Sequence, residues 1–149
     1  MAVRTVELHD REGGSQVLPV TWGTVRIFLH VLAATVWVGG QLTLAAVVPV
    51  LRGAAPGATR PVARRFNQVA WAAYAVLVAT GVWNIMALGD AVTGDYRTTM
   101  IVKVIVVAVS GVTALAHARS KTTAGLAAFG ALTASSALGA LFIGVMLGG

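Results

Sequence analysis

A histidine inside a long apolar segment is the residue of this chain best suited to chemistry. His30 is followed by Trp37 seven residues later and by Gln41 eleven residues later. On an α-helix these spacings are close to two and three turns, so the three side chains share one face. An ionisable ring in an apolar helix is costly and by default marks a functional site. We therefore predict a binding site on this face, with His30 at its centre.

A structural role is the alternative for His30. Polar side chains often join helices inside membranes, so the ring would then hydrogen-bond a backbone carbonyl or a threonine of a neighbouring helix.

The composition is typical of a membrane protein. Of the 149 residues, 57% are hydrophobic and 11% are charged, whereas a soluble domain carries about 25% charged residues. The net charge of +6 would suit nucleic acid, but the basic residues lie in short loops between apolar segments, which indicates membrane topology instead. The chain has no cysteine, which excludes disulfides, iron–sulfur clusters and covalently attached c-type haem.

Four apolar segments each have close to the ~20 residues that cross a bilayer. They cover residues 24–51, 66–88, 99–118 and 124–147. Short connections make neighbouring helices antiparallel, so we predict an all-α, integral membrane four-helix bundle. It forms a single domain over residues 22–149, after a polar tail at residues 1–21 that does not resemble a cleavable signal. Pro49 is expected to end the first span.

The fourth segment carries a row of small residues at every fourth position: Ser136, Ala140, Gly144 and Gly148. Such a row lets two backbones approach closely, either within the bundle or in a homodimer.

The charges predict an orientation in the membrane. The loops after the first and third segments hold six basic residues and no acid: Arg52, Arg60, Arg64, Arg65, Arg119 and Lys121. All five acidic residues lie on the other side: Glu7, Asp10, Glu12, Asp90 and Asp95. By the positive-inside rule the basic loops are cytoplasmic, so both termini are expected to be extracytoplasmic.

This topology places several metal-ligand types in one outer layer. His30 and Lys103 both fall roughly 6–9 Å below the outer surface, at 1.5 Å per residue. Met100 lies one turn before Lys103, and Met86 and Met146 end their spans on the same side. Imidazole and thioether groups bind copper, and methionine favours Cu(I). His30, Met100, Met86 and Met146 are therefore the predicted copper ligands, and their chance placement in an apolar protein is the alternative.

The same layer also suits haem b. His30 would be an axial ligand, and Lys103 would be either a second ligand or the partner of a haem propionate. Trp37 and Gln41 complete this candidate cofactor-binding face. In the alternative interpretation, Lys103 extends to the outer headgroups.

The other two histidines are expected to act elsewhere. His117 lies at the cytoplasmic end of the third span, ~20 Å or more from His30 along the membrane normal, so the two do not share a metal. An interfacial or capping role is predicted for it. His9, in the tail, is either solvated or receives a metal together with Asp10.

Most of the chain, about residues 27–117, resembles the copper resistance D family of bacterial membrane proteins. The resemblance rests on His30, Trp37, Gly39, Gly40, Pro49 and Arg52, on Arg65-Phe66, Ala70 and Thr80-Gly81, and on the segment from Tyr96 to Lys103. It implies a multi-pass protein of the bacterial plasma (inner) membrane that handles copper in uptake or homeostasis. An extracytoplasmic metal donor would be its partner.

The early histidine, the tryptophan–glycine step and the later lysine also resemble the HemJ-type protoporphyrinogen oxidase family. That resemblance implies haem b at His30 and Lys103, and a role in electron transfer or haem-precursor oxidation. We identify no catalytic set of side chains, so enzyme activity is expected only if a haem is present. The leading hypothesis is copper handling, with the haem protein as one alternative and a structural membrane subunit as another.

Overall fold

Four long helices make up the fold. The computed structural model describes residues 18–89 and 92–148. The helices are α1 (Trp22–Ala54), α2 (Thr59–Leu88), α3 (Gly94–Arg119) and α4 (Thr123–Gly148), with a short 3-10 helix, η1 (Pro56–Ala58), before α2. No strand occurs in the described residues. All four helices are long and apolar enough to cross a membrane, so the predicted all-α, multi-pass architecture is confirmed.

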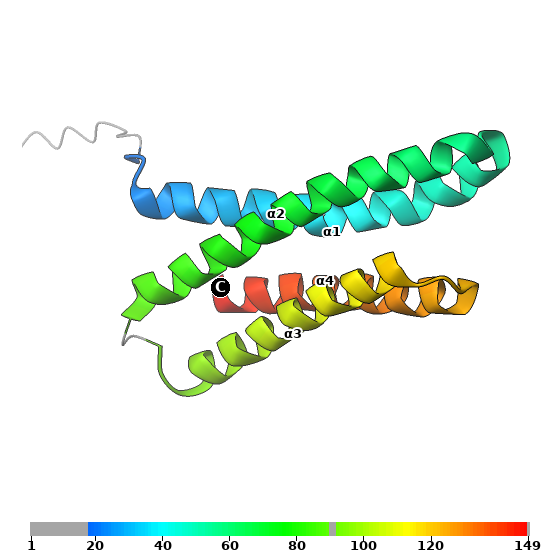
Figure 1. Cartoon of the computed structure of the whole chain (residues 1–149). Helices are drawn as coiled ribbons and strands as arrows, with labels where there is room; N and C mark the ends of the chain where they lie inside the picture. Colours follow the sequence, from blue (N-terminus) through cyan, green and yellow to red (C-terminus); the bar gives the residue numbers. More distant parts are fainter. Residues whose placement is uncertain (1–17, 90–91, 149) are drawn as a thin grey trace, which may run out of the picture.

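The helices form two antiparallel hairpins, which lie one above the other in Figure 1. α1 packs along α2 and α3 packs along α4, while contacts between α1 and α4 join the two hairpins. The α1–α2 and α3–α4 connections lie at the same end of the bundle (Figure 1). We call it the basic end because it carries Arg52, Arg60, Arg64, Arg65, Arg119 and Lys121. The start of α1 and the end of α4 lie at the opposite end (Figure 1).

α1 begins with a reciprocal cap and runs further than expected. The Thr21 hydroxyl accepts from the Thr24 backbone N–H at 3.1 Å, and the Thr24 hydroxyl accepts from the Thr21 N–H at 3.4 Å. The expectation that Pro49 ends the first span is wrong, because α1 continues to Ala54. Pro49 is exposed on the helix surface, and it has no backbone N–H to donate to the carbonyl of Ala45, one turn earlier.

The buried core is small and lies between the hairpins. It is formed by Ala33, Trp37, Val38, Ala70, Leu77 and Ala137, with Phe66 and Tyr74 packed against it. Large apolar side chains such as Ile105 and Phe142 are instead exposed on the outside of the helices. A bundle that is apolar on its outer surface is suited to contact with lipid acyl chains.

The row of small residues on α4 is used inside the chain. Ala140 is buried, and a Cβ atom at Gly144 would lie 3.0 Å from Nζ of Lys103 on α3. Gly148 is exposed. The predicted close approach therefore occurs between α3 and α4, while a homodimer through this row stays a prediction.

Candidate cofactor site

His30 and Thr80 connect α1 and α2. Nδ1 of His30 lies 2.9 Å from Oγ1 of Thr80, which is a bond that the structural alternative for His30 predicts. The buried Thr80 hydroxyl also lies 2.7 Å from the carbonyl of Val76 and 3.1 Å from that of Leu77. A carbonyl can only accept a hydrogen bond, so the single proton of the Thr80 hydroxyl is donated to these carbonyls of α2. The Thr80 oxygen therefore accepts from His30, and Nδ1 of the ring carries the proton.

This arrangement leaves Nε2 of His30 available. A neutral imidazole that is protonated at Nδ1 carries a lone pair on Nε2, and no hydrogen bond to Nε2 is found among residues 18–89 and 92–148. Gly81 lies beside the ring, where an added Cβ would be 3.5 Å from Cε1, so no side chain from that position covers this edge. Metal-bound histidines commonly have one nitrogen held by an oxygen acceptor and the other free for the metal.

Two basic side chains lie in the part of the bundle that holds His30. Lys103, on α3, is partly buried, and its Nζ lies 3.0 Å from where a Cβ at Gly144 would be. Arg26 lies one turn before His30 on α1, and its Nε is buried without a hydrogen-bond partner in the described part of the chain. Asp95 is the only acidic residue within that part, and its side chain is exposed at the start of α3. The site thus combines one imidazole with two basic side chains, of which Arg26 was not predicted from the sequence.

The three methionines of the predicted outer layer have different surroundings. Met100 is only 9% exposed, on the same helix as Lys103 and one turn before it. Met86 and Met146 are 75% and 60% exposed and lie on the outer surface of the bundle. Residues 18–89 and 92–148 contain no group of three or more His, Cys, Asp or Glu side chains that could hold a metal. Met100 is therefore the one of these three methionines that the fold buries.

Trp37 and Gln41 lie further towards the basic end on α1. The Trp37 indole is buried and donates to Oγ of Ser110 at 3.1 Å. Its ring centroid lies 5.8 Å from that of Trp71 and 4.6 Å from that of Tyr74. Nε2 of Gln41 is buried without a partner within the described residues. The Trp37 ring thus belongs to a packed aromatic cluster, which lies on the side of His30 that is nearer the basic end.

Hydrogen bonds from this cluster hold the two hairpins together. Trp37 joins α1 to α3 through Ser110, whose hydroxyl donates to the Thr133 carbonyl of α4 at 3.3 Å. The Tyr74 hydroxyl joins α2 to α3 by donating to the Val107 carbonyl at 3.0 Å. These bonds set the relative position of the hairpins, and therefore that of His30 on one and Lys103 on the other.

Gly111 provides the space in which the Tyr74 ring lies against α3. A Cβ at this buried position would lie 2.6 Å from Cζ of Tyr74. We expect Gly111→Ala to lower the free energy of unfolding by about 1–3 kcal/mol, the usual cost of overpacking a core. Gly39→Ala is the matched control, because a Cβ there meets nothing within 4 Å. Thermal unfolding in detergent checks the prediction, and equal midpoints for the two variants would contradict it.

His117 has a structural role at the basic end. Its Nδ1 donates to the Leu126 carbonyl at 2.9 Å, so it joins the last turns of α3 to the start of α4. The bond adds a helix–helix contact, and the predicted interfacial or capping role stays a prediction. His9 lies outside the described residues.

The fold and the site define a class, a multi-pass membrane protein of two helical hairpins with a histidine and two cations near one end. No family model matches the sequence, and neither a curated protein nor a solved structure matches it.

Proposed function

We propose that this chain is a b-type haem membrane protein in which Nε2 of His30 would bind the iron. The observation that carries the proposal is the orientation of the ring: Thr80 accepts from Nδ1, and Nε2 makes no hydrogen bond among the described residues. Imidazole is a common axial ligand of haem iron. A hydrogen bond from the other ring nitrogen fixes the tautomer and the direction of such a ligand.

The charges around His30 favour haem over a copper ion. Haem b carries two propionates, and Arg26 and Lys103 supply two cations without a described carboxylate in the interior. Guanidinium and ammonium groups form charge-assisted hydrogen bonds with carboxylates. A copper ion at Nε2 would instead be repelled by both cations. We therefore assign Lys103 and Arg26 to the propionates rather than to the iron.

A bound haem would supply one-electron chemistry. The residues of this chain would bind it, orient it and exclude water from the side of the Trp37 cluster. Electron transfer and oxidation of a haem precursor both fit such a site, and the resemblance to HemJ-type proteins favours the second. The proposed setting is the bacterial plasma membrane, with the site towards the extracytoplasmic side.

The direct test is a spectrum together with a metal analysis of one sample. The full chain is expressed with a haem precursor supplied, purified from membranes in detergent, and its visible spectrum is recorded oxidised and reduced. Iron and copper are then measured by mass spectrometry. We expect a Soret band that shifts on reduction and about one iron per chain. Copper without haem would overturn the proposal, and the absence of both metals would favour a structural subunit.

A copper site is the second candidate, and the burial of Met100 is the observation that favours it. His30 and Met100 would then bind Cu(I), since a thioether is a soft ligand, and an extracytoplasmic donor would deliver the ion. This candidate agrees with the resemblance to the copper resistance D family.

Replacing Met100 with leucine distinguishes the two candidates. The exchange nearly conserves volume, so under the haem proposal we expect Met100→Leu to keep the Soret band and the iron content. Met86→Leu, at an exposed position, is the control. Loss of copper from Met100→Leu but not from Met86→Leu would favour the copper site.

A further inference from the structure

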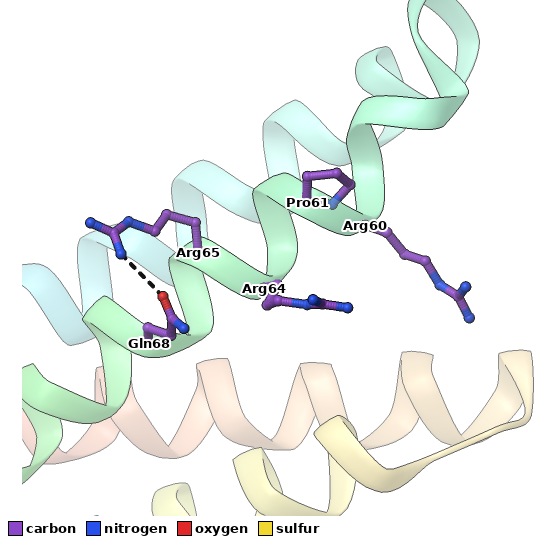
Figure 2. Close-up of a pocket in the computed structure, with 5 residues that line it drawn as sticks. All are labelled: Arg60, Pro61, Arg64, Arg65 and Gln68. Carbon is purple, nitrogen blue, oxygen red and sulfur yellow. Dashed lines mark hydrogen bonds between the residues drawn. The ribbon is translucent and has the colours of Figure 1, made fainter.

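A cationic hollow lies at the basic end, far along α2 from the histidine site. It is lined by Arg60, Pro61, Arg64, Arg65 and Gln68 (Figure 2). Arg60 and Arg64 are one turn apart, both are exposed, and their guanidinium groups extend from the same side of the helix (Figure 2). The Arg65 guanidinium extends to the other side of the helix in Figure 2, where it donates to Oε1 of Gln68 at 3.2 Å.

The positive charge of this hollow is not balanced by the surrounding chain. No acidic residue occurs between Arg52 and Gln68, and the only described acid, Asp95, begins α3, at the opposite end of the bundle. The first turn of α2 contains no acid, and its N-cap residue, Ala58, makes no side-chain hydrogen bond. The Thr59 N–H at the start of that turn donates to the Pro56 carbonyl, and Pro61 has no N–H, so the positive charge of the region comes from the arginine side chains. An anion in the hollow would relieve the repulsion among these like charges.

We propose that this arginine hollow binds the phosphate of an anionic phospholipid headgroup. The hollow is open to the outside and lies at the end of a membrane-spanning helix, where headgroup phosphates are found. Arginine forks bind phosphate with two parallel hydrogen bonds, and basic clusters beside spanning helices attract anionic lipids. Membrane orientation needs only the number of basic residues near a span, whereas binding of one phosphate needs two guanidinium groups on a common side, as Arg60 and Arg64 are (Figure 2).

The test compares two sets of charge-neutralising substitutions in the full chain. The first set removes the positive charges that line the hollow: Arg60→Gln, Arg64→Gln and Arg65→Gln. The second set, Arg52→Gln, Arg119→Gln and Lys121→Gln, removes the same charge from exposed or loop positions at the same end. Phosphatidylglycerol and phosphatidylcholine retained by each protein in detergent are counted by native mass spectrometry.

We expect the wild type to retain phosphatidylglycerol in preference to phosphatidylcholine. The first set should lower its affinity for phosphatidylglycerol about tenfold or more, and the second set less than about twofold. Equal losses in the two sets, or no loss in the first, would overturn the proposal. Displacement of the lipid by millimolar inorganic phosphate would also overturn it, because the site would then bind a free anion. Arg64→Gln alone, which changes one exposed side chain, should give an intermediate loss if the triple variant does not fold.

Discussion

His30→Ala is expected to abolish the haem Soret band of the purified protein and to remove its iron. The substitution deletes Nε2, the proposed axial ligand, and no other described histidine lies in this layer of the bundle. It also leaves the buried Thr80 oxygen without the proton of Nδ1, which costs about 1–3 kcal/mol for an unsatisfied group. The spectrum and the thermal unfolding midpoint should be measured on the same preparation.

His117→Ala is the matched control for this prediction. It removes a partly buried histidine that also bonds between two helices, here to the Leu126 carbonyl, but at the basic end. We expect it to lower stability by a comparable amount and to leave the Soret band in place. Added imidazole should restore part of the band to His30→Ala. A Soret band that survives in His30→Ala, or disappears in His117→Ala, would contradict the assignment of the ligand.

The helices and their order were predictable from residue type alone. Long apolar segments separated by short polar ones leave few other ways to satisfy the backbone in a bilayer, and each predicted span lies within one helix. The capped start at Thr21 and the continuation through Pro49 changed the first boundary by a few residues. The structural alternative for His30 included a hydrogen bond to a threonine, but Thr80 was not identified, because that partner depends on the register between α1 and α2.

The direction in which a side chain points around the helix axis was much harder to predict than its depth in the membrane. Counting residues places Met86, Met100 and Met146 at similar depths, yet Met86 and Met146 face outwards and Met100 faces inwards. In a soluble helix, polarity would separate these faces, but both faces of a membrane helix are apolar. Arg26 shows the opposite case: its spacing of four residues from His30 puts it on the same face, and that spacing is readable in the sequence.

The role of Trp37 illustrates a second limit. Its position on the face of His30 and Gln41 was readable from the seven-residue spacing. Its partners were not, because Ser110 lies 73 residues away in the chain and belongs to the other hairpin. The structure places the indole in an aromatic cluster next to Trp71 and Tyr74, so Trp37 bounds the candidate site through packing. A tertiary contact of this kind follows from how the hairpins dock, which no local pattern contains.

Thr80→Val is expected to weaken haem binding about 10–100-fold, the usual cost of losing a group that orients a metal-bound histidine. Valine nearly matches threonine in shape but cannot accept from Nδ1, so the ring would lose its fixed tautomer and direction. Thr80→Ser keeps the oxygen and should bind haem within a few-fold of the wild type. The measurement is a titration of the haem-free protein with haem, followed at the Soret band.

Stability alone would not explain such a result. Thr113→Val is the control, because Thr113 accepts from the Thr133 hydroxyl at 3.0 Å and the substitution likewise removes an acceptor between two helices. We expect a similar loss of stability, about 1–3 kcal/mol, without weaker haem binding. Equal losses of affinity in Thr80→Val and Thr113→Val would assign the effect to the bundle as a whole. A loss confined to Thr80→Val, and reversed in Thr80→Ser, would show that the hydroxyl acts through His30.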